Sequence, residues 1–392
     1  MKPILLSFLV LTLSLACNKQ EKEVQETSIL PGAWQTGEYL PLLEGKNVAM
    51  VVNHTSTIKN THLVDSLVSL GINIKMIFSP EHGFRGDADA GKKIDSSIDE
   101  ATGIQIISLY GKQRKPTPEN LEGIDLVIFD IQDVGARFYT YISTMHYAME
   151  ACAENNIPML ILDRPNPTGD YIAGPVRKPD QKTFVGMHPI PIVHGLTVGE
   201  LAQMINGEKW LDTLQCELKI IKNKNYAHFD KYEIPIKPSP NLPTARSIRL
   251  YPSLCLFEGT IISIGRGTEF PFQVAGYPDS TFGSYSFTPV SIPGAATYPK
   301  HENKLCYGID LRDGIEADKF TLKYVMDFFK LTGSDTTFFS RPAGFDRLAG
   351  TSELRKQMLD GMTLEEIEAS WEEDLEQYKA MRKKYLLYPD FE

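Results

Sequence analysis

The sequence of 392 residues lacks the short motifs of several enzyme classes. It contains no CxxC pair, no HxH, HxxxH or HExxH spacing, no GxSxG elbow, and neither a GxGxxG nor a GxxxxGK[ST] glycine pattern. These absences argue against a thiol redox centre, a common zinc site, a serine hydrolase, and nicotinamide or P-loop chemistry. We therefore expect no cofactor and no metal.

The chain also lacks basic runs and has one long apolar run. Its 50 acidic and 40 basic residues give a net charge of −10, which argues against nucleic-acid binding. The apolar run, 3–16, is too short to span a bilayer. Four of the five cysteines are isolated in apolar surroundings, which predicts buried thiols and no disulfide framework: Cys152, Cys216, Cys255 and Cys306.

The N-terminus has the pattern of a bacterial lipoprotein signal. Lys2 precedes the apolar run, and Ala16 stands directly before Cys17, although Ser14 departs from the usual apolar residue. We expect a signal peptide at 1–16, a lipid on Cys17, a polar tether at 17–35, and an exported protein anchored to a membrane of the cell envelope. Ordinary secretion with a chance Cys17 is the alternative.

From residue 36 onward, apolar β-rich runs alternate with helical patterns. The predicted strands are 47–52, 74–78, 104–109, 126–130 and 159–162, and the first predicted helices are 60–70 and 138–156. This alternation predicts a Rossmann-like, mostly parallel α/β sheet with helices on both faces, over 36–220.

After about residue 220 the composition changes. Gly, Pro, Ser and aromatic residues fill 251–298, and helical patterns return at 317–331, 351–359 and 363–385. Thr197 with Glu200, and Thr363 with Glu366, have the spacing of helix-capping boxes. We therefore expect a smaller α+β domain over 221–392 that closes a cleft.

Polar residues follow several of the predicted strands. Since ligands bind beyond the carboxyl ends of parallel strands, these residues predict one shared cleft. Glu81 is the first candidate, because burial at a strand end raises a carboxyl pKa and suits a general acid. The alternative is an ion pair between Glu81 and Arg85. Asp130 is the candidate second carboxylate, and Asp133 either supplies one or pairs with Arg137.

Other residues point to an anionic ligand or serve the fold. Guanidinium groups match carboxylates, which makes Arg85, Arg137, Arg164 and Arg266 candidates for binding an acid. Tyr110, Tyr139, Tyr141 and Phe272 could face sugar rings or fill the core. Asp163 is a candidate for ordering the turn before Asn166, and Glu200 for capping its helix. His54, His82 and His194 would be the ligands of a metal site, a hypothesis that their spacing does not support.

Eight segments together resemble one enzyme family, the exo-β-N-acetylmuramidases of the NamZ type (glycoside hydrolase family 171, formerly domain of unknown function 1343). The segments are SPEHGFRG (79–86), FDIQDVGARFYTYISTM (129–145), DRPNP (163–167), PSPNLPT (238–244), LFEGT (256–260), GRGTEFPF (265–272), FDRLAGTSELRKQMLDG (345–361) and LLYP (386–389).

The resemblance implies a Rossmann-like domain, a smaller auxiliary domain, and an active site between them. It also implies release of N-acetylmuramic acid from the non-reducing ends of peptidoglycan fragments, with Glu81 as the catalytic glutamate. The substrate-binding candidates are His54, His82, Arg85, Asp133, Arg137, Tyr139, Arg164, Asn166, His194, Asn241, Glu258, Arg266 and Glu269.

The expected mechanism assigns one role to Glu81 and leaves several candidates for the second role. Glu81 would protonate the leaving oxygen. Asp130, or else Glu258 or Glu269, would orient the acetamide of the sugar or activate water. Two other functions remain open: a metal-dependent hydrolase using the three histidines, and a lipoprotein that binds peptidoglycan fragments without turnover.

Overall fold

The computed structural model describes residues 28–81, 83–85, 97–314 and 319–392. The predicted signal peptide, Cys17 and His82 lie outside these ranges. Across them, no helix combines the length and apolarity needed to cross a membrane.

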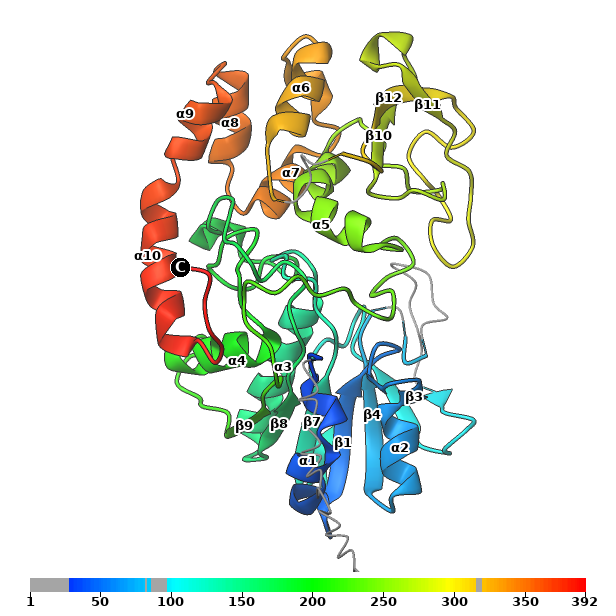
Figure 1. Cartoon of the computed structure of the whole chain (residues 1–392), viewed down its shortest axis with the longest axis vertical. Coiled ribbons are helices and arrows are strands. Elements are labelled where there is room, and N and C mark those ends of the chain that lie inside the picture. The colour runs from blue at the N-terminus through cyan, green and yellow to red at the C-terminus, as the bar shows by residue number, and fades with distance from the viewer. Residues whose placement is uncertain (1–27, 82, 86–96, 315–318) are drawn as a thin grey trace, which may run out of the picture.

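The first lobe is built on a seven-stranded sheet with the strand order β5-β6-β4-β1-β7-β8-β9 (Figure 1). All neighbouring strands are parallel except β5, which is antiparallel to β6. The bounds are β1 (Asn47–Val52), β4 (Asn73–Ser79), β5 (Ser97–Ile98), β6 (Gln105–Ser108), β7 (Leu126–Asp130), β8 (Met159–Leu162) and β9 (Leu218–Ile221), with a small hairpin of β2 (Thr57–Ile58) and β3 (Thr61–His62). The six parallel strands thus follow the Rossmann order 3-2-1-4-5-6, which confirms the predicted fold class.

Side chains alternate between two hydrophobic cores because successive residues of a strand face opposite sides. Ala49 and Val51 pack with helices α3 (Tyr141–Glu154) and α4 (Val198–Gly207). Val48 and Met50 pack on the other face with α1 (Thr36–Leu43) and α2 (Leu63–Ser69). Helices therefore cover both faces. The capping box predicted at Thr197 is present at the start of α4.

The second lobe combines helices with a small antiparallel sheet of order β10-β12-β11 (Figure 1). Its elements are α5 (Ala245–Leu254), β10 (Val274–Tyr277), β11 (Tyr285–Phe287), β12 (Cys306–Asp310), α6 (Lys323–Leu331), α7 (Pro342–Ala349), α8 (Glu353–Leu359) and α9 (Leu364–Ala369). Short 3-10 helices connect the elements of both lobes: η1 (Gly32–Trp34), η2 (Pro118–Leu121), η3 (Pro179–Gln181), η4 (Cys255–Gly259), η5 (Ser280–Phe282), η6 (Thr336–Phe338) and η7 (Lys383–Tyr385).

The four cysteines that the structure describes are free and buried, as predicted: Cys152, Cys216, Cys255 and Cys306.

The single helix predicted over 363–385 is wrong. The chain forms α9 and then α10 (Glu372–Arg382), separated at Trp371, whose ψ of 6° is not helical. The turn buries the Trp371 side chain, which is 7% exposed, and three acidic residues then start α10, where the helix dipole favours negative charge. Burial of one large side chain therefore outweighs the continuous helical pattern.

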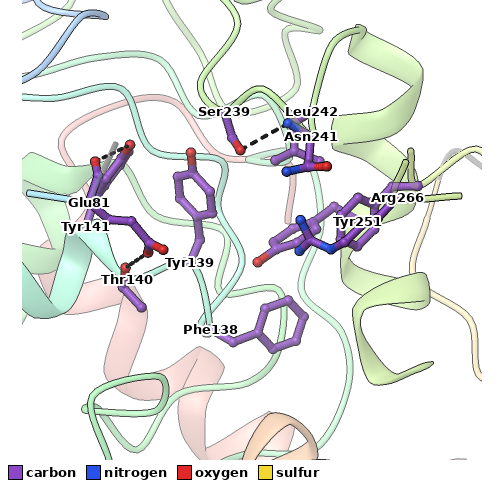
Figure 2. A pocket seen from close by; sticks show the side chains of 11 residues that line it. Glu81, Phe138, Tyr139, Thr140, Tyr141, Ser239, Asn241, Leu242, Tyr251 and Arg266 are labelled. Atoms are coloured by element: carbon purple, nitrogen blue, oxygen red, sulfur yellow. Dashed lines mark hydrogen bonds between the residues drawn. The ribbon is translucent and has the colours of Figure 1, made fainter. Parts of the chain in front are cut away.

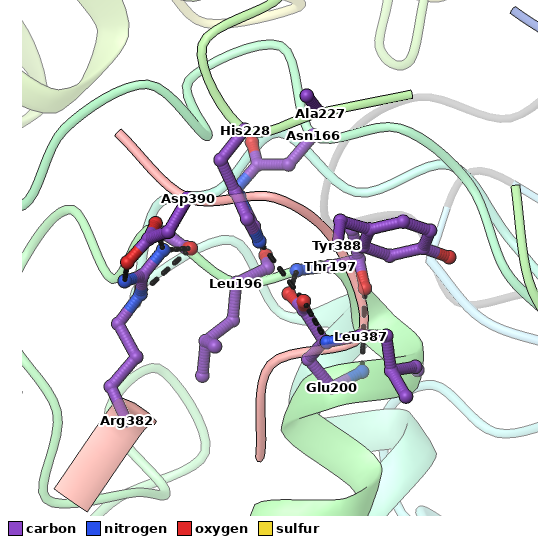
Figure 3. A network of polar contacts seen from close by, with 12 residues as sticks. Asn166, Leu196, Thr197, Glu200, Ala227, His228, Arg382, Leu387, Tyr388 and Asp390 are labelled. Atoms are coloured by element: carbon purple, nitrogen blue, oxygen red, sulfur yellow. Dashed lines mark hydrogen bonds and ion pairs between the residues drawn. The ribbon is translucent and has the colours of Figure 1, made fainter. Parts of the chain in front are cut away.

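The C-terminal segment crosses back to the first lobe, where it closes a buried polar network (Figure 3). The Tyr378 hydroxyl donates to the carbonyl of His194 at 2.6 Å, and the backbone N–H of Leu387 donates to Glu200 Oε1 at 2.8 Å. The Tyr388 hydroxyl donates to Asp163. The chain end is thus part of the core of the first lobe, and it ties the two lobes together.

Candidate active site

A cleft of about 1220 Å³ lies between the two lobes. The first lobe contributes Glu81, Tyr110, Arg114 and Phe184, and the second contributes Tyr251, Glu258, Arg266, Tyr298, Lys300, Arg341 and Arg347. A smaller recess of about 90 Å³ shares Glu81, Phe138, Thr140, Tyr251 and Arg266 with the cleft (Figure 2). Glu81 therefore stands where the recess meets the cleft.

Glu81 follows β4 and Pro80, so the end of a buried strand sets its position. The Thr140 hydroxyl donates to Glu81 Oε2 at 3.4 Å, and the Tyr141 hydroxyl donates to the Glu81 carbonyl at 3.5 Å (Figure 2). Burial and the neighbouring Glu81 carboxylate raise the pKa of Tyr110 to about 12, which keeps that phenol protonated as a donor. The partly exposed carboxyl of Glu81 therefore has the hydroxyls of Thr140, at the start of α3, and of Tyr110, after β6, beside it, while Tyr141 holds the Glu81 backbone.

Aromatic side chains form the wall of the recess. The rings of Tyr139 and Tyr141 meet edge to face at 4.8 Å, and those of Tyr251 and Phe272 at 5.0 Å. The Tyr139 hydroxyl donates to the carbonyl of Pro238 at 2.7 Å. These contacts fix the rings, and such rigid apolar faces suit the binding of a sugar.

Glu258 and Arg266 form an ion pair on the wall of the second lobe. Arg266 Nε lies 2.6 Å from Glu258 Oε1, and its guanidinium stacks 4.9 Å above the centre of the Phe272 ring. Burial opposes ionisation of Glu258, but Arg266 and Lys300 outweigh it and hold the pKa of that carboxyl below its usual range. Glu258 is therefore an anion that cannot readily supply a proton.

The Pro-rich loop 238–243 closes one side of the recess. The Asn241 backbone N–H donates to Ser239 Oγ at 3.2 Å, and Asn241 Nδ2 donates to the carbonyl of Ala295 at 2.8 Å. Asn241 thus joins this loop to the 291–300 segment of the second lobe. The structure places eight of the residues named from the sequence around the cleft and recess: Glu81, Tyr110, Tyr139, Tyr141, Asn241, Glu258, Arg266 and Phe272.

Asp130 and Arg164 lie outside the cleft. Asp130 is fully buried, and its two carboxylate oxygens accept hydrogen bonds from Arg164 Nε and Nη2 at 2.5 and 2.8 Å. A carboxylate sealed against a guanidinium at the sheet edge has no path to a substrate in the cleft. This placement does not fit the catalytic role predicted for Asp130 or the ligand-binding role predicted for Arg164.

Two further arginines have structural partners. Arg85 pairs with Asp65 at 3.0 Å and with Asp99 at 2.9 Å, which overturns the alternative that it pairs with Glu81. Arg137 is fully buried, and it donates to the carbonyls of Pro175, Ile190 and Leu348 rather than to Asp133. Neither arginine lines the cleft.

The remaining predicted residues serve turns and loops. Asp133 Oδ2 accepts from the Gly135 backbone N–H at 2.7 Å and lies 3.8 Å from His194 Nε2. Asn166 Nδ2 donates to the carbonyl of Leu196, and His54 Nε2 lies 2.8 Å from the carbonyl of Lys237. Glu269 is exposed and does not line the cleft.

Two structural alternatives are confirmed. Asp163 Oδ1 accepts from the Arg164 and Gly199 backbone N–H groups, so it orders the turn after β8. Glu200 caps α4, and its Oε1 lies 3.0 Å from His228 Nε2. Within the described ranges, no three His, Cys, Asp or Glu side chains gather as metal ligands.

Sequence reasoning missed the outer part of the cleft. Its lining residues Arg114, Tyr298, Lys300, Arg341 and Arg347 come from loops and from α7, not from predicted strand ends. Of these, only Tyr298 lies in the Gly- and Pro-rich stretch 251–298, whose composition indicates loops but not which side chains face a ligand. Arg347 lies in the 345–361 motif of the family resemblance, which likewise did not single it out.

Three comparisons relate the chain to known proteins. Residues 48–246 match the family model described as exo-beta-N-acetylmuramidase NamZ, N-terminal, and residues 249–388 match its C-terminal counterpart. The curated peptidoglycan beta-N-acetylmuramidase NamZ of Bacillus subtilis is 42% identical over 381 residues, which cover 90% of this chain and 89% of that protein.

Two crystal structures of DUF1343 family proteins from Bacteroides fragilis share the fold. One is 46% identical with a TM-score of 0.86, covering 93% of this chain and 99% of its own. The other is 30% identical with a TM-score of 0.79, covering 92% and 99%.

Proposed function

Because the chain belongs to the exo-β-N-acetylmuramidase NamZ family, we propose that it hydrolyses the β-glycosidic bond of N-acetylmuramic acid at the non-reducing ends of peptidoglycan fragments. The chain is a glycoside hydrolase. The observation that carries the proposal is the position of Glu81, a partly exposed carboxyl where an aromatic recess opens into the cleft between the lobes.

Glu81 is the general acid of this mechanism. Glycoside hydrolysis needs a carboxylic acid beside the glycosidic oxygen, to protonate it as the bond breaks. The other acidic side chain that lines the described part of the cleft is Glu258, which Arg266 and Lys300 hold as an anion. The two carboxyls therefore have different roles, and the proton comes from Glu81.

The nucleophile is the acetamide of the substrate itself. Asp130 is sealed against Arg164, and Glu258 is paired with Arg266, so neither is placed to attack the sugar. In substrate-assisted hydrolysis the acetamide oxygen attacks the anomeric carbon, and water then opens the resulting ring. Two displacements at one carbon leave the released sugar in the β configuration.

The positive charge of the second-lobe wall suits the lactyl carboxylate of muramic acid. Arg266, Lys300 and Arg341 face one acidic residue there, Glu258. Among the described residues, Arg341 has no carboxylate ion-pair partner, whereas Arg85, Arg164 and Arg355 each have one. Since guanidinium groups match carboxylates, the wall favours an acidic sugar over its neutral analogue.

The test is hydrolysis of a disaccharide of N-acetylmuramic acid β-linked to N-acetylglucosamine. We expect release of N-acetylmuramic acid in the β configuration, which NMR of the anomeric proton detects. We also expect that a chelator does not abolish the activity. Glu81→Gln should lower kcat by about 10²- to 10⁴-fold without changing the melting temperature. Glu269→Gln is the matched control, because Glu269 is exposed outside the cleft. Near-normal turnover by Glu81→Gln would refute the assignment.

We also propose that the chain is exported and carries a lipid on Cys17. The support is the pattern of Lys2, the 3–16 apolar run and the Ala16-Cys17 pair. Labelled palmitate should enter the protein and hold it in the membrane fraction of producing cells. Cys17→Ser should lose both the label and the membrane association, and label that persists in this variant would contradict the anchor.

A further inference from the structure

The cleft extends well beyond the site of bond cleavage. The recess of about 90 Å³ is smaller than the roughly 300 Å³ at which small-molecule pockets begin, so it takes only part of the terminal sugar. Glu81 marks the glycosidic oxygen. The rest of the 1220 Å³ cleft, away from the recess, is therefore available to the sugar that leaves.

Tyr298 is an unusual side chain in this outer part. It lines the cleft but not the recess. Its side chain is 90% exposed, the highest value among the exposed large hydrophobic residues that the structure describes. An aromatic face that stays in water within a cleft gains free energy when a flat apolar face of a ligand covers it.

The segment that carries Tyr298 is fastened to the catalytic walls. The Val290 backbone N–H donates to the carbonyl of Gly267 at 2.8 Å, next to Arg266. A Cβ at Gly267 would lie 2.5 Å from the Val290 oxygen and 2.7 Å from Pro299 Cγ, so the two segments touch. Such close approach needs a residue without a side chain.

Lys300 fixes the other end of this segment. Its ammonium donates to the carbonyls of Phe257, Thr260 and Ile262. Two residues away, Tyr298 is thus presented from an anchored backbone. A pre-positioned ring binds a ligand at a lower entropic cost than a mobile one.

We propose that Tyr298 is the stacking platform for the leaving sugar, the residue that makes this enzyme prefer a saccharide over a simple aglycone. The inference rests on the proposed function, because the position of Glu81 defines which side of the bond the outer cleft serves. In this role Tyr298 contacts the N-acetylglucosamine ring and strengthens its binding, and it takes no part in proton transfer.

Two substrates separate this role from a general one. One is the disaccharide with N-acetylglucosamine as the leaving sugar, and the other is the methyl β-glycoside of N-acetylmuramic acid, whose aglycone has no ring. Tyr298→Ala should lower kcat/KM about three- to tenfold for the disaccharide, mainly through KM, and less than about twofold for the methyl glycoside. Tyr298→Phe should keep the wild-type values, because stacking needs the ring and not the hydroxyl.

Phe229→Ala is the matched control, an aromatic side chain that is 59% exposed but lies outside the cleft. Equal losses on both substrates, or none on the disaccharide, would overturn the platform. A wild-type protein that hydrolyses neither substrate would instead refute the proposed function. In that case, calorimetry would measure the affinity of each protein for the disaccharide. A lower affinity for Tyr298→Ala but not for Tyr298→Phe would support the platform, and equal affinities of wild type and Tyr298→Ala would overturn it.

Discussion

Arg164 binds Asp130 through two parallel hydrogen bonds, 2.5 Å from Nε and 2.8 Å from Nη2, at the carboxyl edge of the parallel sheet. This edge, beside β1 and β7, is where Rossmann-like sheets commonly bind ligands. Here a buried ion pair fills it, and Thr57 accepts a further hydrogen bond from Arg164 at 3.3 Å. The reactive cleft is displaced toward the end of β4, where Glu81 meets the second lobe.

The ion pair should matter for stability and not for catalysis. Asp130→Asn leaves the Arg164 charge buried and unpaired, and we expect a loss of about 3–5 kcal/mol in the free energy of unfolding. Urea denaturation measures this loss. Glu353→Gln is the control, because Glu353 pairs with Lys356 at the surface, where about 0–1 kcal/mol is typical. A stable Asp130→Asn protein without activity would restore Asp130 as a catalytic carboxylate.

The Glu258–Arg266 pair should impose a pH dependence on stability. The folded-state pKa of Glu258 is lowered, so the ionised carboxylate stabilises the folded protein. This stabilisation is fully present above the unfolded pKa near 4.5, and it is lost as the pH falls through the lower folded-state pKa. Comparing unfolding of wild type and Glu258→Gln should give a difference that is constant at pH 5–7 and smaller below about 4.5. A difference that grows on acidification would contradict the pairing.

A second pH effect should come from the buried histidine pair, in which His146 Nδ1 lies 3.1 Å from His188 Nε2. Burial lowers the pKa of His146 to about 4, so the native state favours the neutral ring. Above the unfolded pKa near 6.5 the ring is neutral in both states and the free energy of unfolding is at its full value. As the pH falls from 6.5 toward 4, the unfolded state takes up the proton first, and the free energy of unfolding decreases.

Wild type should therefore lose about 2–3 kcal/mol more than His146→Gln between pH 6.5 and 4.5. Urea denaturation of both proteins at the two pH values is the measurement. Parallel profiles for the two proteins would show that His146 titrates normally and is not desolvated in the folded state.

The C-terminal segment should contribute to the stability of the first lobe. Tyr388→Phe removes the hydroxyl that donates to Asp163 and accepts from the Asn223 backbone N–H at 2.9 Å. We expect a loss of about 1–3 kcal/mol, since buried polar groups are left unsatisfied. Thermal melting measures the effect, with exposed Tyr298→Phe as the matched control. Equal melting temperatures would show that the chain end does not stabilise the lobe.

The sequence predicted the local elements of the first lobe well. The strands at 47–52, 126–130 and 159–162 have the observed bounds, because short apolar runs with β-branched residues are typical of strands buried on both faces. The helix predicted at 60–70 begins only at Leu63, since Thr61 and His62 pair with β2 instead. That pairing is a contact between segments, which periodicity does not encode.

For the site, the residue types and motif order were sufficient to predict the family, and they made Glu81 the leading candidate for the acid. They could not show that Asp130, the predicted second carboxylate, lies outside the cleft, because Asp130 also carries a carboxyl at the end of a strand. The difference is a partner: Arg164 covers Asp130, while Glu81 opens to the cleft. Likewise, four arginines were candidates for binding an anion, and only Arg266 faces the cleft.

The sequence alone thus determined the strands, the capped helices and the chemical groups that are available. Tertiary structure decided which charges neutralise one another in the interior, where the helix before Trp371 breaks, and which loops bring Tyr298 and Arg341 to the cleft. The physical reason is that local propensity depends on neighbours along the chain. The exposure and partner of a charged side chain depend instead on segments that lie far away in sequence and meet only in the folded protein.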